Sequence, residues 1–248
     1  MLTLVNIVGQ NYWRAAVGLV RKQQRRMAAW KRPKLQTREW KMSTRIVLAD
    51  DHAILREGVK MILSRAGIEV VGEAENGVEL ISMVRHLRPN VVVTDITMPL
   101  MNGIEAAAEI FKEFGIPSIL LTMHADSGYV LRAISSGSSG YVLKNRVSTC
   151  LVEAIREVSG GNMYLSPGIS NDVFKSFTKG GMEEHLTGRE RQLLQLIAEG
   201  YTTKEIAHLL GITVRTGESH RAKIMDKLNI HNTAGLVRYA LKSGLAQL

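Results

Sequence analysis

From Arg45 onward the chain alternates short apolar runs with longer segments of helical periodicity, and this alternation constrains its fold more than any other feature. The apolar runs that predict strands are 45–49, 68–74, 91–94, 117–122 and 141–143. The segments that predict helices lie near 53–65, 77–87, 103–114, 127–136 and 148–159. Strands that alternate with helices form a parallel sheet with helices on both faces. We therefore expect an α/β doubly wound domain with a five-stranded parallel sheet over residues 43–160.

Polar side chains stand where four of these strands end. Asp95 directly follows VVVT, Asp50 and Asp51 follow the first strand, and Thr122 and Lys144 come at the ends of the fourth and fifth. A helix N-cap would explain one such acid, but it does not explain five polar residues at the ends of four strands. The carboxyl ends of parallel strands meet at one edge of the sheet, where ligands bind. Clustered carboxylates there favour a hard cation such as Mg²⁺.

This set of residues is suited to phosphoryl transfer. Asp95 can attack phosphorus as a nucleophile, and Lys144 with a metal ion can neutralise charge on the phosphoryl oxygens. The Thr122 hydroxyl can then hydrogen-bond the new phosphate. The seven histidines show no spacing typical of a metal site, and we assign them structural roles.

Four sequence blocks at these positions carry a resemblance to a known family. LADDH (48–52), TDITMPLMNG (94–103), LLTMHAD (120–126) and GYVLK (140–144) together resemble the receiver domain of bacterial two-component response regulators. The resemblance implies that Asp95 accepts a phosphoryl group from a separate sensor histidine kinase. It also implies particular contacts for the other residues. Mg²⁺ would be held by Asp50, Asp51, Asp95 and the Thr97 backbone carbonyl, and the phosphoryl-contacting and switch residues would be Thr122, Tyr141 and Lys144.

The last part of the chain, residues 183–248, predicts a small all-α domain. Capping boxes pair Thr187 with Glu190 and Thr202 with Glu205, each at the start of an expected helix. A turn at Gly211 then precedes expected helices near 214–228 and 233–242. Two helices joined by a tight glycine turn form a helix-turn-helix, whose second helix enters the major groove of DNA. Residues 161–182, rich in glycine and serine, predict a linker.

The stretch from LTGRERQ to LVRYA resembles the LuxR-type DNA-binding domain, so the whole chain resembles the NarL type of response regulator. The resemblance implies a transcription regulator that binds double-stranded DNA as a homodimer. Residues expected to face the groove are Glu218, Ser219 and Ala222. Candidates for phosphate contacts, each also explicable as solvated surface, are Thr203, Arg215, Arg221, Lys223 and Lys227. The expected dimer contacts on the last helix are Leu236, Val237 and Ala240.

One residue departs from the LuxR-type pattern, which normally has a valine where this chain has Gly217. Glycine in a helix interior costs about 1 kcal/mol relative to alanine, and the missing side chain forfeits about 1.5–3 kcal/mol of burial. We therefore expect Gly217 to loosen the recognition helix. On the alternative interpretation that follows, the chain is a phosphoacceptor interaction module with impaired DNA binding.

The formal charge of +9 is concentrated in the first 41 residues, which carry ten Lys or Arg and one Glu. The other 207 residues balance at 22 basic and 22 acidic, so net charge gives no evidence that the folded part binds DNA. We expect residues 1–42 to be a basic N-terminal extension. It is either disordered or upstream of a natural start at Met42, or it is an arm attracted to anionic partners.

Two further features bear on where the chain works and on whether it is an enzyme. The single cysteine, Cys150, predicts a reducing compartment, and no apolar run reaches the ~18 residues of a membrane span, so we expect a cytoplasmic protein without a membrane partner. Asp95-Ile96-Thr97 also resembles the nucleophile loop of haloacid dehalogenase-type phosphatases. Those enzymes need a second carboxylate as general acid where this chain has Thr97, so we expect no enzyme.

Overall fold

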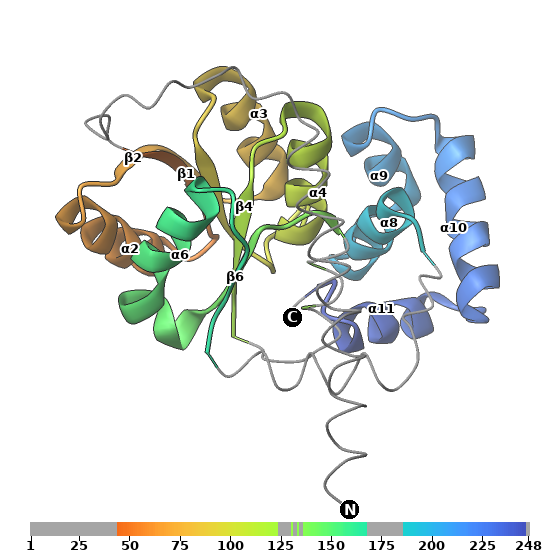
Figure 1. The fold of residues 1–248 in the computed structure, drawn as a ribbon. Helices are drawn as coiled ribbons and strands as arrows, with labels where there is room; N and C mark the ends of the chain where they lie inside the picture. The colour runs from red at the N-terminus through yellow and green to blue at the C-terminus, as the bar shows by residue number, and fades with distance from the viewer. Residues whose placement is uncertain (1–43, 124–129, 131–132, 134–135, 168–185, 247–248) are drawn as a thin grey trace, which may run out of the picture.

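The computed structural model describes residues 44–123, 130, 133, 136–167 and 186–246, and its first part is built on a parallel sheet (Figure 1). The strands are β1 (Arg45–Ala49), β2 (Glu69–Ala74), β3 (Val91–Asp95), β4 (Ser118–Thr122), β5 (Gly140–Leu143) and β6 (Tyr164–Leu165). Their order is β2-β1-β3-β4-β5-β6, and every pairing is parallel. The order reverses between β1 and β3, and open α/β sheets bind ligands at such a switch point.

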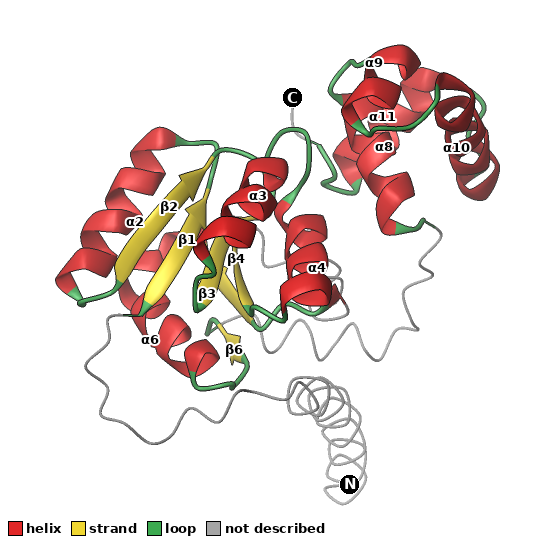
Figure 2. Ribbon diagram, turned by 90° about the horizontal axis from the view of Figure 1, so that it is seen from above, coloured by secondary structure: helices red, strands yellow, loops and turns green. Residues whose placement is uncertain are grey.

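Helices cover both faces of this sheet, which confirms the doubly wound α/β prediction (Figure 2). One face carries α2 (Ala53–Arg65) and α6 (Val147–Ser159), and the other carries α3 (Gly77–Leu87) and α4 (Gly103–Phe114). Because both faces are covered, every residue of β3 and β4 is buried. This explains why these strands read as continuous apolar runs in the sequence.

Two details differ from the sequence prediction. The sheet has six strands rather than five, because Tyr164 and Leu165 pair with Gly140 and Tyr141 of β5. Two residues that we expected in the linker therefore belong to this sheet; a two-residue strand is too short for a periodicity to reveal it. The expected helix at 127–136 lies largely outside the described residues. Of its described residues, Val130 and Ala133 are buried.

The second part of the chain contains α8 (Gly188–Ala198), α9 (Thr203–Leu209), α10 (Val214–Leu228) and α11 (Thr233–Lys242). Both expected capping boxes are present: the Thr187 and Thr202 hydroxyls accept from the backbone N–H of Glu190 and Glu205, whose carboxylates accept in return. Leucine and isoleucine side chains from these helices form one core. The all-α prediction for this domain is confirmed. None of the helices in the described ranges is long and apolar enough to cross a membrane.

Replacing Gly103 by alanine is expected to destabilise the sheet domain. A Cβ atom at Gly103 would lie 1.8 Å from the Asp95 carbonyl oxygen, so the backbone would have to move. Overpacking of this kind costs about 1–3 kcal/mol. Thermal unfolding should be compared with a matched variant, Gly58→Ala in α2, where a Cβ meets nothing within 4 Å and a gain of about 0.5–1 kcal/mol is expected. Equal stability of Gly103→Ala and the parent protein would show that the backbone here moves without cost, contrary to this prediction.

Candidate functional site

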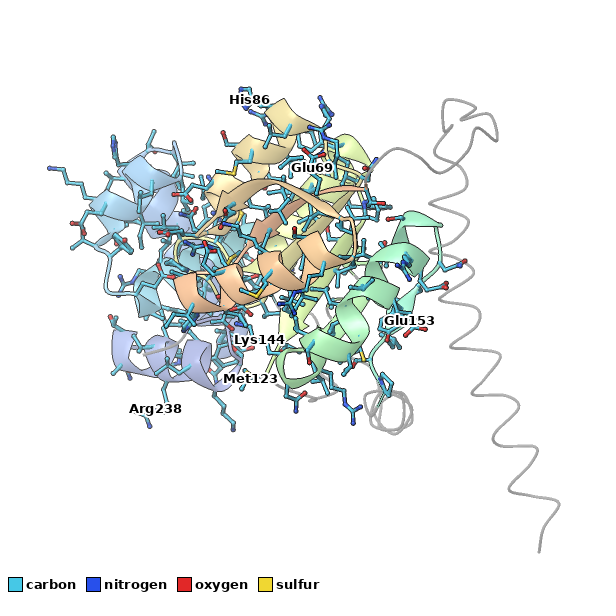
Figure 3. All side chains as sticks on the ribbon, turned by 90° about the vertical axis from the view of Figure 1, so that its left-hand side faces the viewer. Glu69, His86, Met123, Lys144, Glu153 and Arg238 are labelled. Atoms are coloured by element: carbon cyan, nitrogen blue, oxygen red, sulfur yellow. The ribbon has the colours of Figure 1, made fainter. Side chains whose placement is uncertain are left out.

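Three charged residues from three strands meet at the carboxyl edge of the sheet. Asp50 follows β1, Asp95 ends β3, and Lys144 follows β5. The Lys144 Nζ atom lies 2.8 Å from Asp95 Oδ2 and 2.9 Å from Asp50 Oδ2. In Figure 3 Lys144 and Met123 mark this edge, whereas Glu69, at the start of β2, lies toward the other end of the sheet. The structure thus brings together three of the five residues that the strand ends predicted, Asp50, Asp95 and Lys144.

Burial decides the electrostatics of this cluster. Asp50 and Asp95 are only 1% and 4% exposed. Loss of hydration raises the pKa of Asp95 to about 6; the Lys144 ammonium opposes this shift, and the Asp50 carboxylate adds to it. Burial alone would lower the pKa of Lys144, but Asp95 and Asp50 raise it above its usual value, so the lysine stays charged. The site is one cation shared by two buried acids.

The carboxylate cluster has a donor set that fits a divalent cation. Asp50, Asp51, His52 and Asp95 each offer one atom, and these atoms all lie within 4.8 Å of one another. The Thr97 carbonyl accepts no hydrogen bond from the described residues, whereas the Ile96 and Met98 carbonyls each accept one. The Thr97 carbonyl oxygen is therefore available as a metal ligand. Carboxylate and carbonyl oxygens suit Mg²⁺.

His52 lies at the site although its sequence spacing gave no indication of this, and we had assigned the histidines structural roles. Its Nδ1 atom lies 2.8 Å from Asp51 Oδ1 and 3.2 Å from Asp50 Oδ1. The adjacency of Asp50, Asp51 and His52 in LADDH was the available signal. Three consecutive residues leaving a strand give no helical or strand spacing, so a search by spacing passes over them.

Thr122 and Tyr141 also belong to the strands that form this site. Thr122 is the buried last residue of β4. Tyr141 is 1% exposed and packs in a cluster with Ile96, Ile104 and Leu120. The side chain of Tyr141 therefore lies inside the domain.

The loop between β3 and α4 makes contacts that the sequence did not predict, because it binds helix α8 of the helical domain (Figure 1). Gln195 hydrogen-bonds the backbone of Met98 and Asn102, and Glu199 accepts from the Leu100 N–H. The Arg191 guanidinium pairs with Glu105 on α4. Partners about ninety residues apart leave no pattern in a single sequence.

The expected DNA-contacting residues lie mostly on the exposed side of α10. Six are exposed, namely Arg215, Glu218, Ser219, Ala222, Lys223 and Lys227. Thr203 and Arg221 are partly buried, and Arg221 donates to the Thr233 hydroxyl. Lys227 differs from the rest, because its ammonium lies 2.8 and 2.7 Å from the two carboxylate oxygens of the buried Glu190. Lys227 is exposed and also forms an ion pair within its own domain, so its expected phosphate contact stays a prediction.

The structure corrects two of the three expected dimer contacts. Leu236 and Ala240 are 0% exposed, and both belong to the core of their own domain. A side chain buried in the monomer offers no surface to a second copy. Of the three, Val237 alone is partly exposed. The apolar spacing of α11 reflects its packing against α8 within the same domain and does not indicate a dimer interface.

Gly217 lies where α9 packs closely on α10. A Cβ there would be 3.2 Å from Thr203 Cγ2 and 3.9 Å from the Ala207 Cβ. The absence of the valine side chain therefore leaves no cavity at this position, because α9 packs close to the glycine. α10 is continuous from Val214 to Leu228. The structure gives no sign of the loosening that we expected.

A parallel sheet with an acidic carboxyl edge, joined to a helix-turn-helix, defines the class of two-component response regulators. Family models match both parts: "Response regulator receiver domain" over residues 46–156 and "Bacterial regulatory proteins, luxR family" over residues 184–240. The chain belongs to the NarL-type response regulators, which are DNA-binding transcription regulators. Because this family binds DNA, the alternative of an interaction module whose DNA binding is impaired by Gly217 is not favoured.

Individual relatives agree with this assignment. The oxygen regulatory protein NreC of Staphylococcus carnosus (strain TM300) is 38% identical over 213 residues, which cover 81% of this chain and 98% of NreC. A LuxR-family response regulator from Aurantimonas sp. SI85-9A1 is 36% identical, with a TM-score of 0.53 over 55% of this chain and 99% of that one. RcsB of Salmonella enterica serovar Typhimurium, bound to a promoter with the phosphomimetic BeF3−, is 28% identical. Its TM-score is 0.58 over 80% of this chain and 98% of RcsB.

Replacing Asp95 by asparagine should reveal the cost of the buried charge. Because the pKa of Asp95 rises from 3.8 to about 6 on folding, its ionisation weakens the metal-free protein as the pH rises through this range. The loss is roughly 3 kcal/mol. Asp95→Asn should therefore be more stable than the parent at pH 7.5, and the difference should vanish below about pH 4. Denaturant unfolding in EDTA at both pH values measures this. A less stable variant at pH 7.5 would mean that Lys144 outweighs burial.

Gly217→Ala tests the packing of α10 on α9. Alanine should gain about 1 kcal/mol of helix stability, less the cost of moving the Thr203 methyl at 3.2 Å. Thr203→Ser removes that methyl, so the full gain is expected in this background. It corresponds to about 4–8 °C in the melting temperature of a small domain. Calorimetry of the four proteins of this cycle gives the answer, and an equal gain in both backgrounds would show that Thr203 does not limit the site.

Proposed function

We propose that Asp95 is the phosphoacceptor of this regulator and that a sensor histidine kinase is the phosphoryl donor. The observation that carries the proposal is the shared cation: Lys144 lies within 3 Å of both Asp95 and Asp50 in a buried site at the sheet's switch point. An Asp95 carboxylate oxygen would attack phosphorus, the phosphorus–nitrogen bond to the kinase histidine would break, and the imidazole would leave.

Residues from four strand ends would hold the product. Lys144 pairs with a phosphoryl oxygen, the Thr122 hydroxyl donates to another, and Asp50 and Asp51 remain as carboxylate ligands beside the Thr97 carbonyl. Bound Mg²⁺ supplies positive charge that offsets the repulsion between these carboxylates and the phosphoryl oxygens. The product carries about −1.5 to −2 charges at pH 7 where Asp95 carried at most one.

The DNA-binding part of the proposal rests on α10. Its exposed side presents Glu218, Ser219 and Ala222 to the major groove, and Arg215 and Lys223 lie where phosphates can be reached. We propose that a homodimer forms on two half-sites about one helical turn apart, and that the partly exposed Val237 lies at its interface. We also propose that the protein works in the cytoplasm.

The test is DNA selection that depends on Asp95. The full chain is treated with Mg²⁺ and a small phosphodonor and used to select fragments of its source genome, beside an Asp95→Ala control. We expect enrichment of inverted repeats by the parent protein alone, with an affinity that falls steeply with salt because phosphate contacts release counterions. Enrichment that is equal in Asp95→Ala would refute the phosphorylation switch. Absence of enrichment, with phosphoryl transfer confirmed by mass, would refute the DNA output.

A further inference from the structure

The loop that follows Asp95 is held at two places, and only one of them belongs to the receiver domain. At its base the Gly103 N–H donates to the Ile96 carbonyl at 2.8 Å. At its tip the contacts come from α8 of the DNA-binding domain. The residues between these two points include Thr97, whose carbonyl belongs to the proposed metal site.

Gln195 contacts this loop through both atoms of its side-chain amide. Its Nε2 donates to the Met98 carbonyl at 2.7 Å, and its Oε1 accepts from the backbone N–H of Asn102 at 3.0 Å. Gln195 is 1% exposed, so these bonds form away from water. A buried amide that satisfies a carbonyl and an N–H four residues apart fixes the distance between them.

The loop needs such support because it contains a strained residue. Leu100 has a φ of 65°, in the left-handed region that a leucine rarely adopts. Its N–H donates to both carboxylate oxygens of Glu199 at 3.2 Å, and its side chain packs against the core of the DNA-binding domain. Gln195 Nε2 also donates to Glu199 at 2.7 Å, so the two side chains act together. Strain of this kind persists only where the surroundings over-determine it.

We propose that Gln195, a residue of the DNA-binding domain, is a positioning residue for Mg²⁺ binding in the receiver domain. By fixing Met98 and Asn102 it would hold the preceding Thr97 carbonyl at the proposed metal site. The proposal rests on the proposed phosphoacceptor site and adds to it a ligand-positioning contact from the other domain. By linkage, Mg²⁺ then strengthens the contact between α8 and the loop to the same extent.

The contact leaves the recognition helix accessible, which separates this coupling from simple blockage of DNA. In the structure with α8 on the loop, Arg215, Glu218 and Ser219 of α10 are exposed. Their exposure means that the contact of Gln195 with the loop does not act by covering α10.

The experiment compares the full-length parent with Gln195→Leu and with Arg191→Met as the matched control. Leucine has a similar volume but makes neither hydrogen bond, whereas Arg191 joins the same two domains through Glu105 on α4 without touching the loop tip. Mg²⁺ affinity is measured by titration calorimetry, and amide exchange is followed at Leu100 and Asn102. Loss of a ligand's supporting contact lowers metal affinity by about 10–100-fold; for Gln195→Leu, which acts through the backbone, we expect about 5–10-fold with faster exchange at both amides.

Arg191→Met should keep the Mg²⁺ dissociation constant within about twofold of the parent, because Glu105, with which Arg191 pairs, is not one of the proposed metal ligands. The proposal is overturned if Gln195→Leu binds Mg²⁺ as the parent does, even where its amides exchange faster. Glu199→Ala, at a less buried position, provides a second variant with a smaller effect in the same direction should Gln195→Leu not fold. Asp95→Ala distinguishes the two proposals: retained Mg²⁺ binding in this variant would overturn the acidic site itself, whereas lost binding supports the site and leaves Gln195→Leu to decide the positioning role.

Discussion

The structure depends on a single lysine that compensates two buried acids. Asp50 and Asp95 come from neighbouring strands, and without the ammonium of Lys144 their carboxylates would repel each other in a site that water hardly reaches. The three strands that carry these residues must therefore keep their register at the carboxyl edge. The rest of the receiver follows from this demand: apolar strands covered on both faces exclude the water that would otherwise screen the charges.

The same arrangement would allow the proposed site both to hold a cation and to respond to a phosphoryl group. Burial makes the charged form of Asp95 unfavourable, so any partner that neutralises it is bound strongly. Thr122 and Tyr141 lie within the same strand layer, so a change at Asp95 is close to the buried ring of Tyr141. On the other side of Asp95 the chain runs directly into the loop held by α8. A chemical change at Asp95 would thus be next to two packed parts of the protein, the buried ring of Tyr141 and the loop held by α8.

Much of this architecture could be predicted from the sequence, for reasons that are local. A strand that is buried on both faces, such as 91–95, is recognisable in the sequence as a continuous apolar run. The capping boxes at Thr187 and Thr202 mark helix starts, and polar residues at strand ends indicate the acidic edge. What could not be predicted depends on tertiary packing. Apolar spacing in α11 cannot tell a core position such as Leu236 from a dimer contact, and the approach of α9 to Gly217 is invisible before folding. The bonds of Gln195 to Met98 and Asn102 join residues 93–97 positions apart, so they too lie beyond local pattern.

Helix α8 packs on both sides. One side contributes to the core of the helix-turn-helix domain, and the other side binds the loop between β3 and α4. Domains that share a helix in this way are not freely interchangeable parts. If this receiver were joined to an unrelated DNA-binding domain, Leu100 would lose the carboxylate and the apolar surface that support its left-handed backbone. A substitution on either side of the contact would therefore favour a compensating one on the other.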